Sequence, residues 1–168
     1  MKNDINLLTT IFVEYGHNIA LLLERVKGIS FNSIDREGNN LLHYYSKSAA
    51  KLDFNRNEIV DLLIQNGINI NQPQKGGKKL TPLHRAVLHN DCELCKVLIE
   101  KGAVIDSLDA NGGTPLFTAV MDYRGGDGSI ISFLIKKGAD TQYQNHFGNS
   151  PVSMAHTIVN YNLMQFFK

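Results

Sequence analysis

Glycine recurs in this chain at nearly equal intervals, each time directly after an apolar run. Gly28, Gly67, Gly102 and Gly138 are separated by 39, 35 and 36 residues, and runs such as Val97-Leu98-Ile99 precede them. A glycine that follows an apolar-periodic segment is the expected residue just past a helix end, because it adopts the left-handed conformation without a Cβ penalty. The period therefore predicts an array of repeated helical units.

A second series of motifs lies in register between these glycines. Leu41-Leu42-His43, Thr81-Pro82-Leu83-His84, Thr114-Pro115-Leu116-Phe117 and Ser150-Pro151-Val152-Ser153 occupy the same place in successive units. Thr or Ser followed by Pro is typical of a helix start, with the hydroxyl as N-cap and Pro at the first helical position. Turn-forming residues precede three of the four motifs. Each unit thus consists of a turn, a capped helix, a loop, a second helix and a glycine stop.

At these motifs the chain resembles the ankyrin repeat, whose signature is a turn plus two helices carrying T-P-L-H-x-A. Thr81-Pro82-Leu83-His84-Arg85-Ala86 matches that signature at every specified position. The resemblance implies an all-α fold, an ankyrin-repeat solenoid of about five helix-turn-helix units with short turn or hairpin fingers and terminal caps.

We expect one domain, residues 1–168, because helix pairs this short bury their apolar faces only by stacking. The expected units are residues 1–33 (an N-terminal cap, with the family's loop glycine at Gly16-His17), 34–70, 71–105, 106–141 and 142–168 (a C-terminal cap). In the last unit Met164, Phe166 and Phe167 are expected to close the core. With both caps present, the array is expected to be complete.

Three segments are longer than the repeat requires. Residues 46–57 add about six residues and 122–129 about three, both between the two helices of a unit, and residues 73–80 form a basic, glycine-tipped finger. Insertions confined to one face of a repeat array often mark the binding face. We therefore expect at least one insertion to contact the partner; the alternative is neutral loop drift, because long surface loops cost little entropy.

Chemical motifs are scarce. His84, His89, Cys92 and Cys95 have metal-like spacing, but the resemblance gives His84 a hydrogen-bonding role between repeats, and the register places Cys95 inward as a small apolar residue. No nucleophile–base grouping, paired-carboxylate motif or P-loop occurs; Gly125-Gly126-Asp127-Gly128 lacks the Lys-Ser/Thr that a P-loop needs. We therefore predict neither enzyme activity nor a metal or other cofactor.

Charge and composition narrow the partner class. Lys+Arg 17 against Asp+Glu 16 gives a net charge of +1, which predicts neither nucleic-acid nor membrane-surface binding. Two cysteines are too few for a disulfide framework, and no signal peptide or membrane span is apparent at the N-terminus. We expect a cytoplasmic protein that is monomeric when free and binds another protein.

The ankyrin resemblance also implies where a partner binds: at the turn tips and at the exposed ends of the first helices. Transferred by register and extended to the neighbouring insertion, these candidate protein-binding residues are Arg36, Glu37, Asn39, Lys75, Lys78, Lys79, Leu88, His89, Asn111, Met121, Asp122, Tyr123, Arg124, His146 and Phe147. Leu88, Met121 and Phe147 are apolar where solvation favours polar residues, and with Tyr123 and Arg124 they are the expected hot spots. The alternative is that one or two of them only pack against the next unit.

The C-terminal segment resembles a narrower group. Thr157-Ile158-Val159-Asn160-Tyr161 and the terminal Phe166-Phe167 are similar to the end of small bacterial ankyrin proteins, several of which are encoded beside polymorphic toxins as immunity proteins. That resemblance implies a cognate toxin domain as partner, and the net charge of +1 argues against a cationic nuclease. The alternative is an effector or scaffold that docks on a host or regulatory protein.

Overall fold

The structure is a computed structural model that describes residues 10, 24–25, 31, 33–48 and 55–168. Within these residues it is all-helical and contains no strand, as the sequence predicts. The helices are α3 (Leu41–Ser48), α4 (Arg56–Gln65), α5 (Pro82–Leu88), α6 (Cys92–Glu100), α7 (Pro115–Met121), α8 (Ser129–Lys136), α9 (Pro151–Thr157) and the 3-10 helix η2 (Leu163–Phe166). Most of the expected N-terminal cap (1–33), with Gly16 and Gly28, and the insertion core 49–54 lie outside the described residues. The count of five units therefore stays a prediction.

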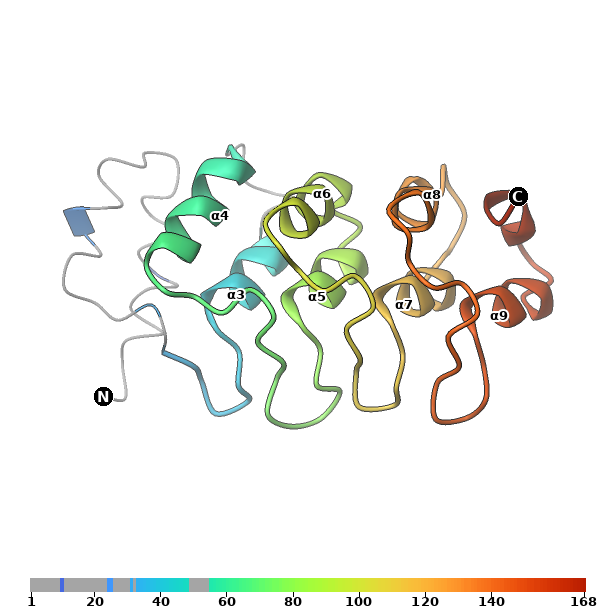
Figure 1. Ribbon diagram of the computed structural model, residues 1–168, viewed down its shortest axis with the longest axis horizontal. Coiled ribbons are helices and arrows are strands. Elements are labelled where there is room, and N and C mark those ends of the chain that lie inside the picture. The colour runs from blue at the N-terminus through green and yellow to red at the C-terminus, as the bar shows by residue number, and fades with distance from the viewer. Residues whose placement is uncertain (1–9, 11–23, 26–30, 32, 49–54) are drawn as a thin grey trace.

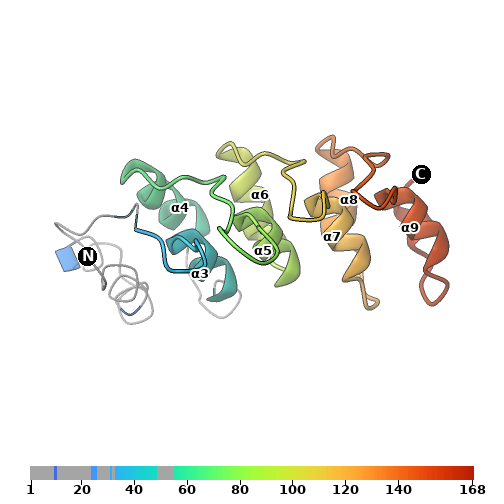
Figure 2. The same cartoon turned by 90° about the horizontal axis from the view of Figure 1, so that it is seen from below.

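The helices form two rows. Helices α3, α5, α7 and α9 pack in succession in one row, and α4, α6 and α8 pack in succession in the other. Figure 1 shows the connecting turns extending below the first row, and Figure 2, seen from below, shows the pairs following one another along a single axis. Among the described helices, the main contacts of each pair are thus with the pairs next to it along the chain.

Leucines at fixed register positions build the core between the rows. Leu83 and Leu116 in the first row, and Leu63, Leu98 and Leu134 in the second, are completely or almost completely buried. Full burial of one such side chain contributes about 1.5–3 kcal/mol. Cys95 lies in the same core, as the register predicts, and burial raises the pKa of its thiol.

The predicted helix starts are confirmed. Thr81, Thr114 and Ser150 are the N-caps of α5, α7 and α9, and each accepts a hydrogen bond from the backbone three residues later, with Pro next in sequence. The glycines that follow the second-row helices have the predicted left-handed conformation as well. Gly102, for example, has a φ of 97°, and the next amide, Ala103 N–H, donates back to Leu98 O. These signals end each helix after two turns or so and thereby set the period.

Four turns, which we call fingers 1 to 4, precede the first-row helices: residues 35–39, 74–80, 109–113 and 145–149. In fingers 1, 3 and 4 one carboxylate or amide oxygen, such as Asp109 Oδ1, accepts from the backbone two and four residues on. Finger 2 is two residues longer, and Gln74 takes the place of the acid: its N–H donates to Leu80 O, and its Oε1 accepts from Leu80 N–H. Adjacent fingers are joined by single backbone hydrogen bonds, among them Lys75 N–H to Glu37 O (2.8 Å) and His146 N–H to Asn111 O (2.9 Å).

Two buried histidines tie α3 and α5 to the fingers that follow them. Nδ1 of His43 accepts from the Asn40 backbone N–H, so the ring proton lies on Nε2, which donates to Leu80 O at 3.0 Å. His84 repeats the arrangement, with Nδ1 near Thr81 N–H and Nε2 3.2 Å from Gly113 O. The structural role that the resemblance implied for His84 is therefore present.

The histidine links predict a pH-dependent stability. Burial lowers the pKa of His43 from 6.5 to about 4, with a smaller lowering from Arg85, and burial lowers the pKa of His84 as well. The unfolded chain therefore binds more protons than the folded one between these values. Stability is fully present above pH 6.5 and is lost as pH falls from there toward 4, by roughly 3 kcal/mol for His43. Urea unfolding across this range measures the loss.

The matched variant for that measurement is His43→Gln with His84→Gln, in which the amides keep a donor but do not titrate. Its unfolding free energy is expected to be lower than that of the wild type at neutral pH and to change less with pH between 6.5 and 4. An unchanged slope would assign the acid sensitivity to other groups.

The 122–129 insertion packs against the C-terminal segment at one glycine. Gly128 has a φ of 62°, and a Cβ placed on it would lie 2.1 Å from Phe166 Cζ. Phe166, Met164 and Phe167 are half-buried against the core, as expected of a closing segment. Glycine at 128 thus permits the C-terminal aromatic side chain to cover this loop.

We expect Gly128→Ala to destabilise the chain by about 2 kcal/mol more than Gly77→Ala. Gly128 and Gly77 have nearly the same φ (62° and 56°), but a Cβ at Gly77 meets nothing within 4 Å, so the difference isolates the clash with Phe166. Chemical unfolding of the two variants gives the comparison. Equal losses would mean that Phe166 moves aside without cost.

Candidate protein-binding surface

The finger tips place most of the predicted binding residues in solvent. The exposed members are Arg36, Glu37, Lys75, Lys78, Lys79, Asn111, His146 and Phe147. Phe147 stands out, because 71% of its surface is accessible and it occupies the tip position that carries Glu37 in finger 1 and Asn111 in finger 3.

Asn39 differs from the other predicted tip residues because it is buried. Its backbone N–H and its Nδ2 donate to the two oxygens of Asp35, and its Oδ1 accepts from Gln74 Nε2 at 2.7 Å. Its amide therefore holds fingers 1 and 2 together. The position looked like a tip because only the residue count from Asp35, not the direction of the side chain, is visible in sequence.

Hydrogen bonds fix the protonation states of Asp35 and Tyr44 at the base of finger 1. Burial alone would raise the pKa of Asp35, but hydrogen bonds from Tyr44 and Asn39 outweigh it and lower the pKa. Burial, followed by the bond to Asp35, raises the pKa of Tyr44 to about 12. Asp35 is thus an ionised acceptor held by its own finger and by α3, which leaves Glu37 as the acid that faces the neighbouring groove.

A groove of about 530 Å³ lies between fingers 1 and 2 and the exposed side of α5. Five polar residues, two leucines and two glycines line it. They are Arg36, Glu37, Gln74, Gly76, Gly77, Lys78, Leu80, Arg85 and Leu88. Leu88, predicted as an exposed hot spot, is half-buried at the α5 end of this groove. The structure thus brings Arg36, Glu37, Lys78 and Leu88 together.

Arg85 is a groove residue that the sequence reasoning missed. It is the variable residue of the Thr81–Ala86 motif, and it precedes Leu88 by three residues, so both lie on one helix face. That spacing was visible in the sequence and could have identified it. Its Nε is buried and has no hydrogen-bond partner among the described residues.

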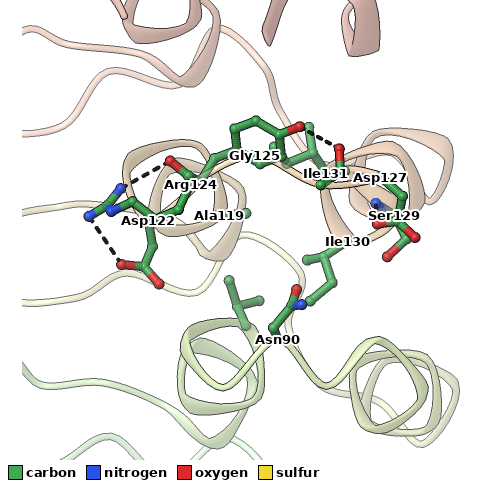
Figure 3. A pocket seen from close by; sticks show the side chains of 13 residues that line it. Asn90, Ala119, Asp122, Arg124, Gly125, Asp127, Ser129, Ile130 and Ile131 are labelled. Atoms are coloured by element: carbon green, nitrogen blue, oxygen red, sulfur yellow. Dashed lines mark hydrogen bonds and ion pairs between the residues drawn. The ribbon is translucent and has the colours of Figure 1, made fainter. Parts of the chain in front are cut away.

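A second hollow, of about 240 Å³, lies under the 122–129 insertion (Figure 3). Asn90 reaches it from the loop between α5 and α6, while Ile130 and Ile131 enter from α8. Arg124 lies at its rim, 3.5 Å from Asp122 and with Nη1 donating to Met121 O. Met121 is 42% exposed beside it. This hollow is separate from the groove of fingers 1 and 2 in its lining residues.

Tyr123 belongs to the packing of this region more than to its surface. Its ring meets Tyr161 and Phe166 edge-on, with centroids 5.2 and 5.8 Å away, and its hydroxyl donates to Gly126 O. The half-buried ring therefore bridges the insertion and the C-terminal segment. Among the predicted hot spots, Tyr123 is the residue that best fits the alternative of packing within the chain.

Among the described residues no group of three or more His, Cys, Asp or Glu gathers as a metal site. Cys92 is half-buried, Cys95 is inside the core and His84 bonds to Gly113 O. His89 is half-buried just past α5. In the described part of the chain no helix is long and apolar enough to cross a membrane.

The sequence matches the family model for ankyrin repeats, in three copies, over residues 47–145. The chain belongs to the ankyrin-repeat family. The matched range contains α4 to α8 and fingers 2 and 3. Ankyrin repeats are protein-interaction modules, so the finger face and the first-row helix ends are a candidate protein-binding surface, with the non-catalytic character typical of such repeats.

Relatives include the ankyrin repeat protein OPG189 of variola virus, 30% identical over 140 residues, or 80% of this chain and 24% of that protein. The phosphocholine transferase AnkX of Legionella pneumophila is 34% identical over 112 residues, 66% of this chain and 11% of that protein. A putative ankyrin repeat protein of fowlpox virus, FPV230, is 36% identical over 100 residues, 58% of this chain and 50% of that protein. The chain thus spans half or less of the length of these relatives.

Tyr123→Ala is expected to lower the unfolding free energy by about 1–3 kcal/mol, because it removes both aromatic contacts. Tyr123→Phe keeps them and loses only the bond to Gly126 O, so its loss is expected to stay under about 1 kcal/mol. Met121→Ala, at an exposed neighbour, is the control and is expected to change stability little. Thermal unfolding of the three variants tests this order, and a Tyr123→Ala protein as stable as Met121→Ala would refute the bridging role.

Proposed function

We propose that this chain is a non-catalytic binding module whose finger face, together with the adjoining ends of the first-row helices, engages one partner protein. The observation that carries the proposal is Phe147. A large aromatic side chain at a polar tip position, 71% exposed, contributes nothing to the chain's own core. Burial of such a side chain against a partner supplies a typical hot spot.

Phe147→Ser is expected to weaken binding of the partner at least about tenfold without changing stability. Val104→Ser is the matched control, because Val104 is also apolar and half-exposed (52%) but lies after α6, away from the finger tips. Calorimetric titration with the purified partner measures both. If Val104→Ser weakens binding as much as Phe147→Ser does, the finger face is the wrong surface.

The partner that we propose is a cognate toxin domain, which this chain occludes in the cytoplasm as an immunity protein, itself monomeric when free. The support is the likeness of the segment from Thr157 to Phe167 to the ends of bacterial ankyrin immunity proteins. Co-expression with the product of the adjacent gene tests it, since the chain is expected to restore growth and Phe147→Ser is not. A product that is harmless by itself, or toxicity that the chain does not relieve, would remove the immunity assignment.

A second candidate function is an effector or scaffold that docks on a host or regulatory protein. It is favoured by the three relatives named above, which come from poxviruses and Legionella pneumophila. The two candidates differ in the source of the partner. Binding to a host protein, with no rescue from a neighbouring gene product, would support the effector.

A further inference from the structure

We propose that the groove between fingers 1 and 2 binds an acidic segment of the partner, with one carboxylate seated on the guanidinium of Arg85. The inference rests on the proposed protein-binding function and names the chemistry that one part of the surface recognises. It concerns a different surface element from Phe147, which lies in finger 4.

The cations around this groove are unpaired. Arg36, Lys75, Lys78, Lys79 and Arg85 form no ion pair within the described residues, whereas Arg56, Lys96, Lys101 and Arg124 each pair with an acid. A chain with a net charge of only +1 therefore concentrates five free cations at two adjacent fingers and α5. Clusters of one sign steer and orient an oppositely charged partner.

The acids nearby do not neutralise this cluster. Asp35 is ionised, but both of its oxygens accept hydrogen bonds from finger 1 and α3, and it does not line the groove. Glu37 lies at the exposed edge of the groove, where its Oε2 accepts weakly from Asn39 Nδ2 at 3.3 Å. One carboxylate thus faces the three cations that line the groove, Arg36, Lys78 and Arg85.

Arg85 is the anchor because its position differs from that of the lysines. The three lysines are exposed finger residues, but Arg85 is half-buried on α5, and its Nε is buried without a hydrogen-bond partner among the described residues. A buried donor without a partner costs free energy that a bound acceptor recovers. The planar guanidinium presents two parallel N–H groups, which match a carboxylate.

The apolar part of the groove favours an apolar side chain next to the bound carboxylate. Leu80 is buried in its lining and Leu88 is half-buried there, so an apolar side chain next to the acid finds contact. The volume of about 530 Å³ accommodates a few residues of an extended segment. We therefore expect alternating acidic and apolar residues in the segment that binds.

The probe is a short acetylated and amidated peptide in which glutamate and leucine alternate, titrated into the ¹⁵N-labelled full chain. The Nε–H resonance of Arg85, assigned by its loss in Arg85→Lys, is expected to shift on binding. Arg85→Met is expected to weaken the peptide at least about fivefold, and Lys78→Gln about twofold with a weaker dependence on salt. Lys136→Gln, an exposed cation on α8, is the matched control and is expected to bind as the wild type does. The ¹⁵N–¹H spectrum of free Arg85→Met shows whether its loss of binding comes from unfolding, and Arg85→Lys, which keeps the charge but not the planar guanidinium, is expected to bind more weakly than the wild type.

Three results would overturn the proposal: an Arg85 resonance that does not move, equal binding of the peptide with glutamine in place of glutamate, or equal weakening by Lys136→Gln. Tighter binding of oligothymidylate than of the peptide would assign the cluster to nucleic acid instead. If the partner binds in a Phe147-dependent manner while the peptide does not bind, the protein-binding function stands and the groove assignment falls.

Discussion

The hydrogen bond from a buried histidine to the next finger is the interaction on which the array depends. His43 and His84 each occupy the third position of a helix, where Nδ1 satisfies a backbone N–H at the helix start and Nε2 reaches a carbonyl of the following unit. One side chain thus closes its own helix and fixes the distance to the next. Each pair of helices is too short to fold by itself. The histidine link holds neighbouring pairs together, so that they bury one continuous core.

The same hydrogen bond also fixes the bases of fingers 2 and 3. Leu80 and Gly113, the carbonyls that the histidines reach, are the last residues before the caps Thr81 and Thr114, so a fixed helix also fixes the base of the finger. Finger 2 carries two extra residues without disturbing this base, since Gln74 closes it against Leu80. Length is therefore free to vary at the tip, which is where Lys75, Lys78 and Lys79 lie.

The sequence predicted what depends on local backbone chemistry and missed what depends on side-chain direction. Helix starts at Thr81, Thr114 and Ser150 follow from hydroxyl capping, and the burial of Cys95 follows from register. Asn39 and Tyr123 were predicted to be surface residues, but Asn39 is buried and its amide bonds to the neighbouring finger, and the half-buried ring of Tyr123 packs on Tyr161. Arg85 was overlooked because it stands at the variable position of the motif, and only its spacing from Leu88 pointed to it. The unpaired state of its Nε becomes visible only when the neighbouring finger is in place.

Two of the four first-row helices, α7 and α9, lack the histidine, and its replacement in α7 separates the two proposed binding elements. Phe117 stands where His43 and His84 stand, and a phenyl ring has no N–H to give to finger 4. That finger is held by its own Asn145 turn and by the bond from His146 N–H to Asn111 O. The half-buried Phe117 and the exposed Phe147 therefore make the end of the array that holds finger 4 more apolar, while fingers 1 and 2 are cationic. A partner that matches both would present an acidic segment and an apolar patch some two fingers apart, and such a pattern gives the interaction a direction along the array.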